Sequence, residues 1–327
     1  MLQEREEPGT VPAALDFRVS VIVPTFNRRD RVLRAIRSAL AQRLAPQEIV
    51  VVDDGSNDGT AEAVRRLAES QPAIRYLQQP NKGAAAARNR GMGAATGNWL
   101  AFLDSDDEWT PDKLQNAANL VAASPDTEFV HSNRSHRMPD GTVIGGWRYA
   151  AEDLADKHFL MRGFTLKTTT VMLKRSLAQS IGGFREDLHT CEDYEFFWRA
   201  VAQARRVGYV AECDAVIHVS DDGLTTGHTR SFLMRDNVAA LGSAARWMER
   251  EPSLTTLARV MRARQYWEYR SLLQHQLRRG AILPAMQLLA RPPDPLPGDR
   301  RARAALSACA GLLKKEPPYE GPGAPDN

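Results

Sequence analysis

Trp99-Leu-Ala-Phe-Leu-Asp-Ser-Asp-Asp107 is an apolar run that ends in three closely spaced carboxylates. The apolar part, residues 99–103, predicts a short buried strand, and the acids follow where that strand must stop. Aspartates packed this closely repel one another, and a divalent cation among them relieves the repulsion. Because such a cation usually also holds a phosphate, the segment predicts a metal–diphosphate site. The alternative is an acidic helix N-terminus, since Thr110-Pro111-Asp112 downstream is typical of a helix start.

The segments before this run alternate between strand and helix patterns. Short apolar runs predict strands at residues 19–23, 49–52 and 74–77. Helices are predicted between them, the first capped by Asn27 and the next two over about residues 60–69 and 84–94. Because the strands lack alternating polarity, we expect an α/β fold with a mostly parallel central sheet flanked by helices.

Polar residues stand at the carboxyl ends of three of these strands. They are Pro24-Thr25, Asp53-Asp54 and the acids of residues 104–107. Ligands in open α/β sheets bind beyond the carboxyl ends of the strands, so the three clusters should converge on one crevice. This convergence favours the ligand site over the helix N-terminus.

The second half of the chain changes from mixed to helical patterns. Strands are predicted at residues 128–131 and 169–173, a turn at Gly182-Gly183 and helices over residues 193–204, 232–249 and 254–277. We therefore divide the chain into four parts. They are an N-terminal tail (1–16), an α/β domain (17–225), a basic helical C-terminal region (226–315) and a disordered tail (316–327).

Charge is unevenly distributed along the chain. The net charge of the 327 residues is +3, but residues 226–315 contain 16 Lys and Arg against 6 Asp and Glu. This excess predicts peripheral contact with an anionic membrane surface, and a solvated helix face is the alternative. Acceptor binding and self-association as a homodimer are the other roles open to the region. No recognition motif indicates nucleic acid.

Cysteine usage and the chain ends bear on the compartment. Cys191, Cys213 and Cys309 are widely spaced and odd in number, so they predict neither a disulfide framework nor a zinc site. No apolar run is long enough to span a bilayer, and residues 1–7 lack the apolar core of a signal peptide. We expect a cytoplasmic protein, peripheral at the inner face of the membrane.

Five motifs, in order, resemble those of the family 2 glycosyltransferases, which have the Rossmann-like GT-A fold. They are Val19-Ser-Val-Ile-Val-Pro-Thr-Phe-Asn-Arg28, Ile49-Val-Val-Val-Asp-Asp-Gly-Ser-Asn-Asp-Gly-Thr60, Asn81-Lys-Gly-Ala-Ala-Ala-Ala-Arg-Asn-Arg-Gly91, Leu103-Asp-Ser-Asp-Asp107, and Gly182-Gly-Phe-Arg185 with Cys191-Glu-Asp-Tyr-Glu-Phe-Phe-Trp-Arg199. The resemblance covers residues 17–225. It implies an inverting, metal-dependent enzyme that moves a sugar from a nucleotide-diphosphate sugar to a glycan, lipid-linked or other hydroxyl acceptor. Its implied setting is bacterial cell-surface polysaccharide biosynthesis.

The resemblance also implies roles for the acids. The Asp-x-Asp-type carboxylates Asp104, Asp106 and Asp107 would bind the donor and a divalent metal, Mg²⁺ or Mn²⁺. We expect Asp106 and Asp107 at the metal, with His218 either a third contact or a buried structural histidine. Asp193 matches the family's base, with Glu192 as the fallback, and helix N-terminal charge is the alternative role of this pair. A single base without a carboxylate nucleophile implies inversion at the anomeric carbon.

Other residues match the part of the family that holds the nucleotide. Asp54 matches the nucleobase position, where a carboxylate can accept the imide N–H of uracil or thymine, and the alternative is a turn-forming Asp. The resemblance therefore implies a UDP- or dTDP-sugar donor. Pro24 and Thr25 would line the base pocket with backbone groups. Lys82 and Arg88 either contact base, ribose or diphosphate, or are solvated helix charges.

Two other functions share parts of this pattern. A sugar nucleotidyltransferase of related fold would need a Gly-rich loop with Arg and Lys after the first strand, where this chain has Pro24-Thr-Phe-Asn-Arg28. A catalytically inactive glycan-binding relative would lack one of the essential acids, yet all of them are present. The transferase is therefore the favoured interpretation.

Overall fold

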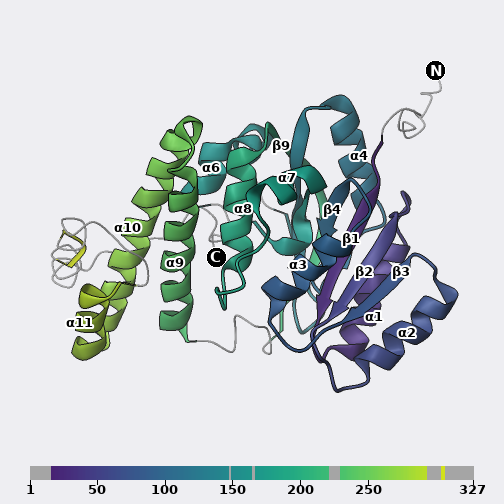
Figure 1. Cartoon of the computed structure of the whole chain (residues 1–327), viewed down its shortest axis with the longest axis horizontal. Helices are drawn as coiled ribbons and strands as arrows, with labels where there is room; N and C mark the ends of the chain where they lie inside the picture. The colour runs from purple at the N-terminus through teal and green to yellow at the C-terminus, as the bar shows by residue number, and fades with distance from the viewer. Residues whose placement is uncertain (1–15, 147–148, 164–165, 221–228, 293–302, 306–327) are drawn as a thin grey trace.

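The computed structural model describes residues 16–146, 149–163, 166–220, 229–292 and 303–305. In these residues one nine-stranded sheet has the order β3-β2-β1-β4-β8-β6-β9-β5, with β7 paired to β6. Helices flank the sheet, and α9, α10 and α11 form a helical layer at the end of the molecule opposite β1–β3 (Figure 1). Most of the predicted N-terminal tail and all of the predicted tail 316–327 lie outside the described residues.

The first four strands are parallel and carry the predicted alternation with helices. They are β1 (Val19–Thr25), β2 (Glu48–Asp53), β3 (Ile74–Gln78) and β4 (Trp99–Phe102), connected by α1 (Arg29–Leu40), α2 (Thr60–Ser70) and α3 (Ala84–Ala94). Ile22 and Val50 pack into the core on one face of the sheet, whereas Val21 and Ile49 pack into the core on the other. Burial on both faces explains why β1, β2 and β4 show no alternating polarity, whereas the edge strand β3 is only partly buried.

The following elements extend the sheet with mixed directions. In chain order they are β5 (Glu108–Trp109), α4 (Lys113–Ala123), β6 (Thr127–Arg137), β7 (Val143–Gly145), α5 (Ala151–Ala155), α6 (Lys157–Arg162), η1 (Thr168–Thr170), β8 (Val171–Lys174), α7 (Arg175–Ile181), α8 (Glu192–Gln203) and β9 (Arg206–His218). β8 is antiparallel to β4 and β6, and β6 is parallel to β9.

The structure excludes the alternative of a helix start at residues 104–107, and it shows that the predicted Asn27 cap is wrong. The 104–107 acids do not begin a helix, because β5 follows them and α4 begins only at Lys113. Asn27 does not cap α1; its φ is 50° and its Oδ1 accepts from the Asn57 N–H at 2.9 Å. Asp58 instead accepts from the Arg29 N–H at 3.0 Å. The cap comes from the loop after β2, so the local spacing around Asn27 could not indicate it.

Two C-terminal helices, α9 (Arg230–Met248) and α10 (Thr255–Arg278), lie close to the predicted ranges 232–249 and 254–277. The short η2 (Pro252–Leu254) and α11 (Ile282–Ala290) were not predicted. Leu241 and Met261 belong to the same core cluster as Phe102 and Phe197, so α9 and α10 extend the core of the sheet domain. No helix in the described residues is long and apolar enough to cross a membrane.

Candidate active site

The acid cluster of residues 104–107 occupies the loop between β4 and β5, and each acid has a different partner. Asp104 Oδ1 accepts from Arg88 Nη2 at 2.9 Å, and Asp106 Oδ2 lies 2.7 Å from Arg28 Nη1. Asp107 Oδ2 accepts from Thr169 Oγ1 at 2.6 Å. The loop is therefore held by α3, by the residue before α1 and by η1.

Repulsion within this cluster is only partly compensated. Burial raises the pKa of Asp106, and the Arg28 guanidinium opposes that increase. Burial raises the pKa of Asp107 well above its usual range, and the charges of Asp104 and Asp106 add to the effect. Three acids therefore lie together in a largely buried loop, and a hard divalent cation would relieve both the burial cost and the repulsion of the ionised carboxylates.

A divalent cation fits this donor set with help from a ligand. The described part of the chain contains no group of three His, Cys, Asp or Glu side chains arranged to hold a metal. Mg²⁺ commonly binds through one or two carboxylates and takes its remaining ligands from substrate phosphates and water. Asp106 and Asp107 therefore suit a cation that binds together with a diphosphate.

His218 lies beside the cluster at the end of β9, which pairs with β5. Its backbone N–H donates to Asp107 Oδ1 at 3.1 Å, and its ring Nε2 lies 2.6 Å from Glu108 Oε1. The backbone contact helps to orient Asp107. A role of the His218 ring as a third metal contact stays a prediction.

Glu192 and Asp193 begin α8, directly after Cys191 in the left-handed conformation (φ 61°). Asp193 Oδ2 accepts from Thr168 Oγ1 at 3.1 Å, which orients the carboxylate. Burial and the neighbouring Glu192 charge raise the pKa of Asp193 to about 6, although Arg88 and Lys167 lower it. A carboxylate with a pKa near neutrality is suited to accept a proton from a substrate hydroxyl.

Arg88 connects the two groups of acids. Its guanidinium donates from Nη1 to Glu192 Oε1 at 2.7 Å and from Nη2 to Asp104 Oδ1 at 2.9 Å. The close approach of α3 to β1 positions it, since a Cβ at Gly91 would lie 2.6 Å from Ile22 Cγ2. The Arg88 side chain is 7% exposed, so the prediction of a solvated helix charge is wrong for this residue. The Lys82 side chain, in contrast, is exposed.

Asp54 is buried at the end of β2 and fixes the start of α3. Its Oδ1 accepts from Gln79 Nε2 at 2.8 Å and from the Lys82 N–H at 2.9 Å, and its Oδ2 accepts from the Gly83 N–H at 2.8 Å. A carboxylate has about four acceptor positions, so one remains for another donor. The buried residues Pro24 and Thr25 lie at the same edge, where the Thr25 carbonyl accepts from the Asp54 N–H at 2.9 Å.

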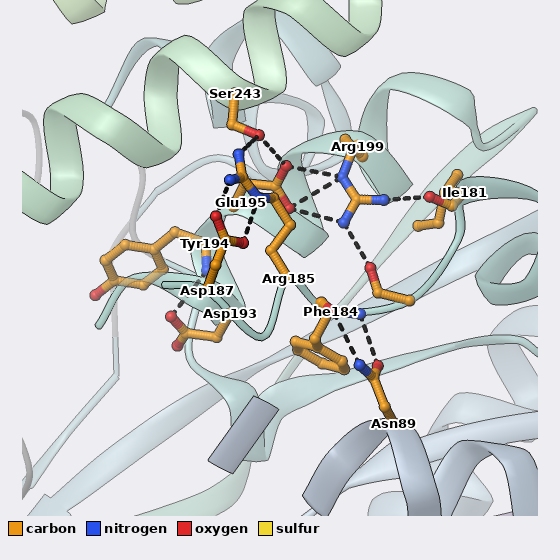
Figure 2. A network of polar contacts seen from close by, with 11 residues as sticks. Asn89, Ile181, Phe184, Arg185, Asp187, Asp193, Tyr194, Glu195, Arg199 and Ser243 are labelled. Atoms are coloured by element: carbon orange, nitrogen blue, oxygen red, sulfur yellow. Dashed lines mark hydrogen bonds and ion pairs between the residues drawn. The ribbon is translucent and has the colours of Figure 1, made fainter. Parts of the chain in front are cut away.

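A buried polar network lies behind Asp193 and joins α8 to α9 (Figure 2). Glu195 accepts from Arg199 Nη2 at 2.7 Å and from Ser243 Oγ at 2.7 Å. Arg185 Nη1 donates to the same Ser243 hydroxyl oxygen at 2.7 Å. Because every member has a charged or hydrogen-bonded partner, the network fixes α8 relative to α9.

The turn before α8 is fixed by contacts from two sides. Arg199 donates to the carbonyl oxygens of Ile181 and Gly183. Asn89 Oδ1 on α3 accepts from the Phe184 N–H at 2.8 Å, and Asn89 Nδ2 donates to the Phe184 carbonyl at 2.8 Å (Figure 2). These contacts hold Asn89, the neighbour of Arg88 in sequence, against the turn that precedes Asp193 in the chain.

The sequence comparisons show the family of this chain. The model of glycosyl transferase family 2 matches residues 20–181. The succinoglycan biosynthesis protein ExoO of Rhizobium meliloti is 30% identical over 296 residues, which cover 84% of this chain and 82% of ExoO. This chain belongs to glycosyl transferase family 2.

Other relatives of this family 2 glycosyltransferase are matched over shorter stretches. The chondroitin synthase of Pasteurella multocida is 28% identical over 187 residues, which cover 55% of this chain and 18% of the synthase. Four further curated relatives are matched over 33% to 62% of their own length. The chain therefore spans less than two thirds of the length of these curated relatives.

Two solved structures have the same fold at low identity. S. aureus TarS in complex with UDP aligns with a TM-score of 0.63 and 19% identity, covering 90% of this chain and 92% of that one. The mannosyltransferase PcManGT from Pyrobaculum calidifontis, in complex with GDP-Man and Mn²⁺, aligns with a TM-score of 0.56 and 21% identity, covering 95% and 92%. The predicted GT-A architecture with C-terminal helices is thereby confirmed.

Several residues around the acids of this glycosyltransferase were not predicted from the sequence. Thr168 and Thr169 contact Asp193 and Asp107, Lys167 lowers the pKa of Asp193, and Glu195 and Arg199 support α8. The i, i+4 spacing of Glu195 and Arg199 was a visible signal for their ion pair. The run Lys167-Thr-Thr-Thr170 carried no comparable signal.

Proposed function

We propose that this family 2 glycosyltransferase moves a sugar from a UDP- or dTDP-sugar to a hydroxyl of a glycan or lipid-linked acceptor, with inversion, in cell-surface polysaccharide biosynthesis. The observation that carries the proposal is the Arg88 guanidinium, which joins Asp104 to Glu192 and so brings the acid cluster and Asp193 to one edge of the sheet. The similarity to ExoO, a succinoglycan biosynthesis protein, supports the biosynthetic setting.

Asp193 is the base in this proposal. Its carboxylate accepts the proton of the acceptor hydroxyl as that oxygen attacks the anomeric carbon. Thr168 orients one carboxylate oxygen, and the nearby cations Arg88 and Lys167 keep the carboxylate ionised near neutral pH. One base and one displacement give inversion, and Glu192, bound to Arg88, is the fallback base.

The donor occupies the edge formed by the ends of β1, β2 and β4. Asp106 and Asp107 would hold a divalent cation, Mg²⁺ or Mn²⁺, with His218 as a candidate third contact. A bound cation supplies charge neutralisation for the departing diphosphate. The free acceptor position of Asp54 receives the imide N–H of the pyrimidine, Pro24 and Thr25 line the base, and Lys82 and Asp104 contact the remainder of the nucleotide.

A thermal-shift screen tests this donor assignment. UDP- and dTDP-sugars with Mn²⁺ or Mg²⁺ should raise the melting temperature, because a ligand that binds only the folded state stabilises it. GDP-sugars should have a smaller effect. A preference for GDP-sugars would overturn the pyrimidine assignment, and stabilisation only by nucleoside triphosphates would favour a sugar nucleotidyltransferase.

A further inference from the structure

The helix α11 presents large apolar side chains to solvent. Ile282, Leu283 and Met286 are 64%, 66% and 60% exposed. Their i, i+1, i+4 spacing places them on one side of the helix, while Ala285 and Leu288 are buried. The buried side packs beside Tyr269 of α10, at the end of the molecule opposite β1–β3 (Figure 1).

The chain on both sides of these residues is basic. Residues 269–293 contain four arginines and no Asp or Glu. Arg278 and Arg279 precede α11 and Arg291 follows it, and all three are exposed. We call the apolar residues Ile282, Leu283 and Met286 with these three arginines the α11 surface.

We propose that the α11 surface docks on an anionic lipid bilayer. Apolar side chains on one helix side, with arginines at the helix ends, match the boundary between acyl chains and headgroups. The apolar side chains enter that boundary, while the arginines contact lipid phosphates and their stems lie along it. Net charge alone indicated an anionic partner for residues 226–315; the structure assigns the contact to one helix.

Charge favours a bilayer over a second copy of this chain. A contact between two copies through Ile282 and Leu283 would bring two equally basic segments, residues 269–293 of each copy, close together, and their charges repel one another. An anionic bilayer neutralises them instead. A purely solvated basic face would not require three large apolar side chains in water.

The proposal goes beyond the glycosyl transfer proposed above and does not depend on the donor site. Docking would also hold the enzyme at the surface where lipid-linked acceptors lie. Docking therefore favours lipid-linked acceptors over other hydroxyl acceptors, and it does not affect the choice of donor.

Vesicle flotation of the full chain tests the proposal. We expect binding to vesicles of phosphatidylcholine mixed with phosphatidylglycerol, weak binding to phosphatidylcholine alone, and loss of binding at high salt. The triple variant Ile282→Gln/Leu283→Gln/Met286→Gln should lower the partition coefficient by about tenfold or more. Arg278→Gln/Arg279→Gln should lower it by about tenfold at low salt.

Matched variants elsewhere on the surface serve as controls. Val143→Thr/Ile144→Thr removes two apolar side chains of β7 that are 51% and 56% exposed. Arg37→Gln/Arg66→Gln removes two exposed arginines of α1 and α2. Both control variants should bind vesicles as the wild type does. All variants should have a melting temperature close to that of the wild type, since the altered side chains are exposed.

Several results would overturn the proposal. One is that the wild type does not bind vesicles containing phosphatidylglycerol, and another is that the triple variant binds them as strongly as the wild type does. A wild-type dimer that the triple variant converts to monomers, without vesicle binding, would identify a second copy as the occupant. Measuring nucleotide-sugar binding in the absence of vesicles separates the two proposals. If the wild type binds no nucleotide sugar, the donor site is contradicted. If the wild type does not float with the vesicles, only the α11 surface is contradicted.

Discussion

The acid cluster after β4 and the acid pair at the start of α8 are compensated differently. Asp106 pairs with the Arg28 guanidinium, and Asp107 is held by a hydroxyl and a backbone N–H. Glu192 and Asp193 lie instead near the cations Arg88 and Lys167. Burial raises the pKa of acids in both regions. Three acids gathered in one loop suit a metal, whereas the pKa of Asp193, near 6, suits a proton acceptor.

The two regions are also supported differently. The cluster lies in a loop that is held by side chains from several elements. Asp193 lies on a helix that the buried Glu195–Arg199 pair and Ser243 connect to the rest of the fold (Figure 2). Since catalytic groups on rigid, hydrogen-bonded elements are positioned more precisely, the α8 pair is the part of the site where small displacements should matter most.

The largest effect is expected from Asp193→Asn. Removal of a general base typically costs about 10²–10⁴-fold in rate, because the hydroxyl proton has no acceptor. Initial-rate kinetics should show this loss in kcat, while calorimetry should show nearly unchanged nucleotide-diphosphate binding. A variant that keeps wild-type kcat would assign the base to another group, and Glu192→Gln would then be the next variant to measure.

Asp106→Ala should have the next largest effect, and on a different property. A cation that Asp106 would hold would be worth several kcal/mol in neutralising charge, so a variant unable to hold it should lose the increase in nucleotide affinity that Mn²⁺ produces. Calorimetric titration with UDP, with and without Mn²⁺, measures it. Asp126→Ala, at an exposed acid 59% accessible to solvent, is the control. Equal metal dependence in both variants would contradict the assignment.

Lys167→Gln should shift the pH dependence. The base must be ionised, so kcat/KM of the wild type should rise with pH through about 6, the pKa of Asp193. Lys167 lowers that pKa, and its removal should move the rise to higher pH. Activity near pH 6 should fall several-fold and activity at high pH should be kept. A pH profile of kcat/KM that coincides with the wild type would separate Lys167 from the base.

Ser243→Ala should have the smallest effect and should act on stability. The variant removes one hydroxyl that bonds Glu195 and Arg185, which costs about 1–2 kcal/mol of unfolding free energy. Urea denaturation measures the loss, with Ser180→Ala as the control, since its hydroxyl contacts only the preceding turn at the Leu177 carbonyl. If both variants have the same unfolding free energy, the Ser243 contacts do not stabilise the packing of α9 on α8.

Local patterns were sufficient for much of this protein. Apolar runs without alternation indicated buried parallel strands, because burial on both faces leaves no polar side. Residues 104–107 stood out as acids at a strand end, whereas Glu192 and Asp193 were singled out by the resemblance to the family 2 glycosyltransferases. The ranges of α9 and α10 followed from helical periodicity.

Contacts between distant segments were decided only by the packed structure. Arg88 and Glu192 are 104 positions apart, and no spacing rule connects them. The same holds for Asp58 at the start of α1 and for Thr169 at Asp107, whose partners lie 29 and 62 positions away. A side chain's type and neighbours in sequence set what it can bind, whereas the packing of α3, α8 and η1 on one sheet sets what it meets.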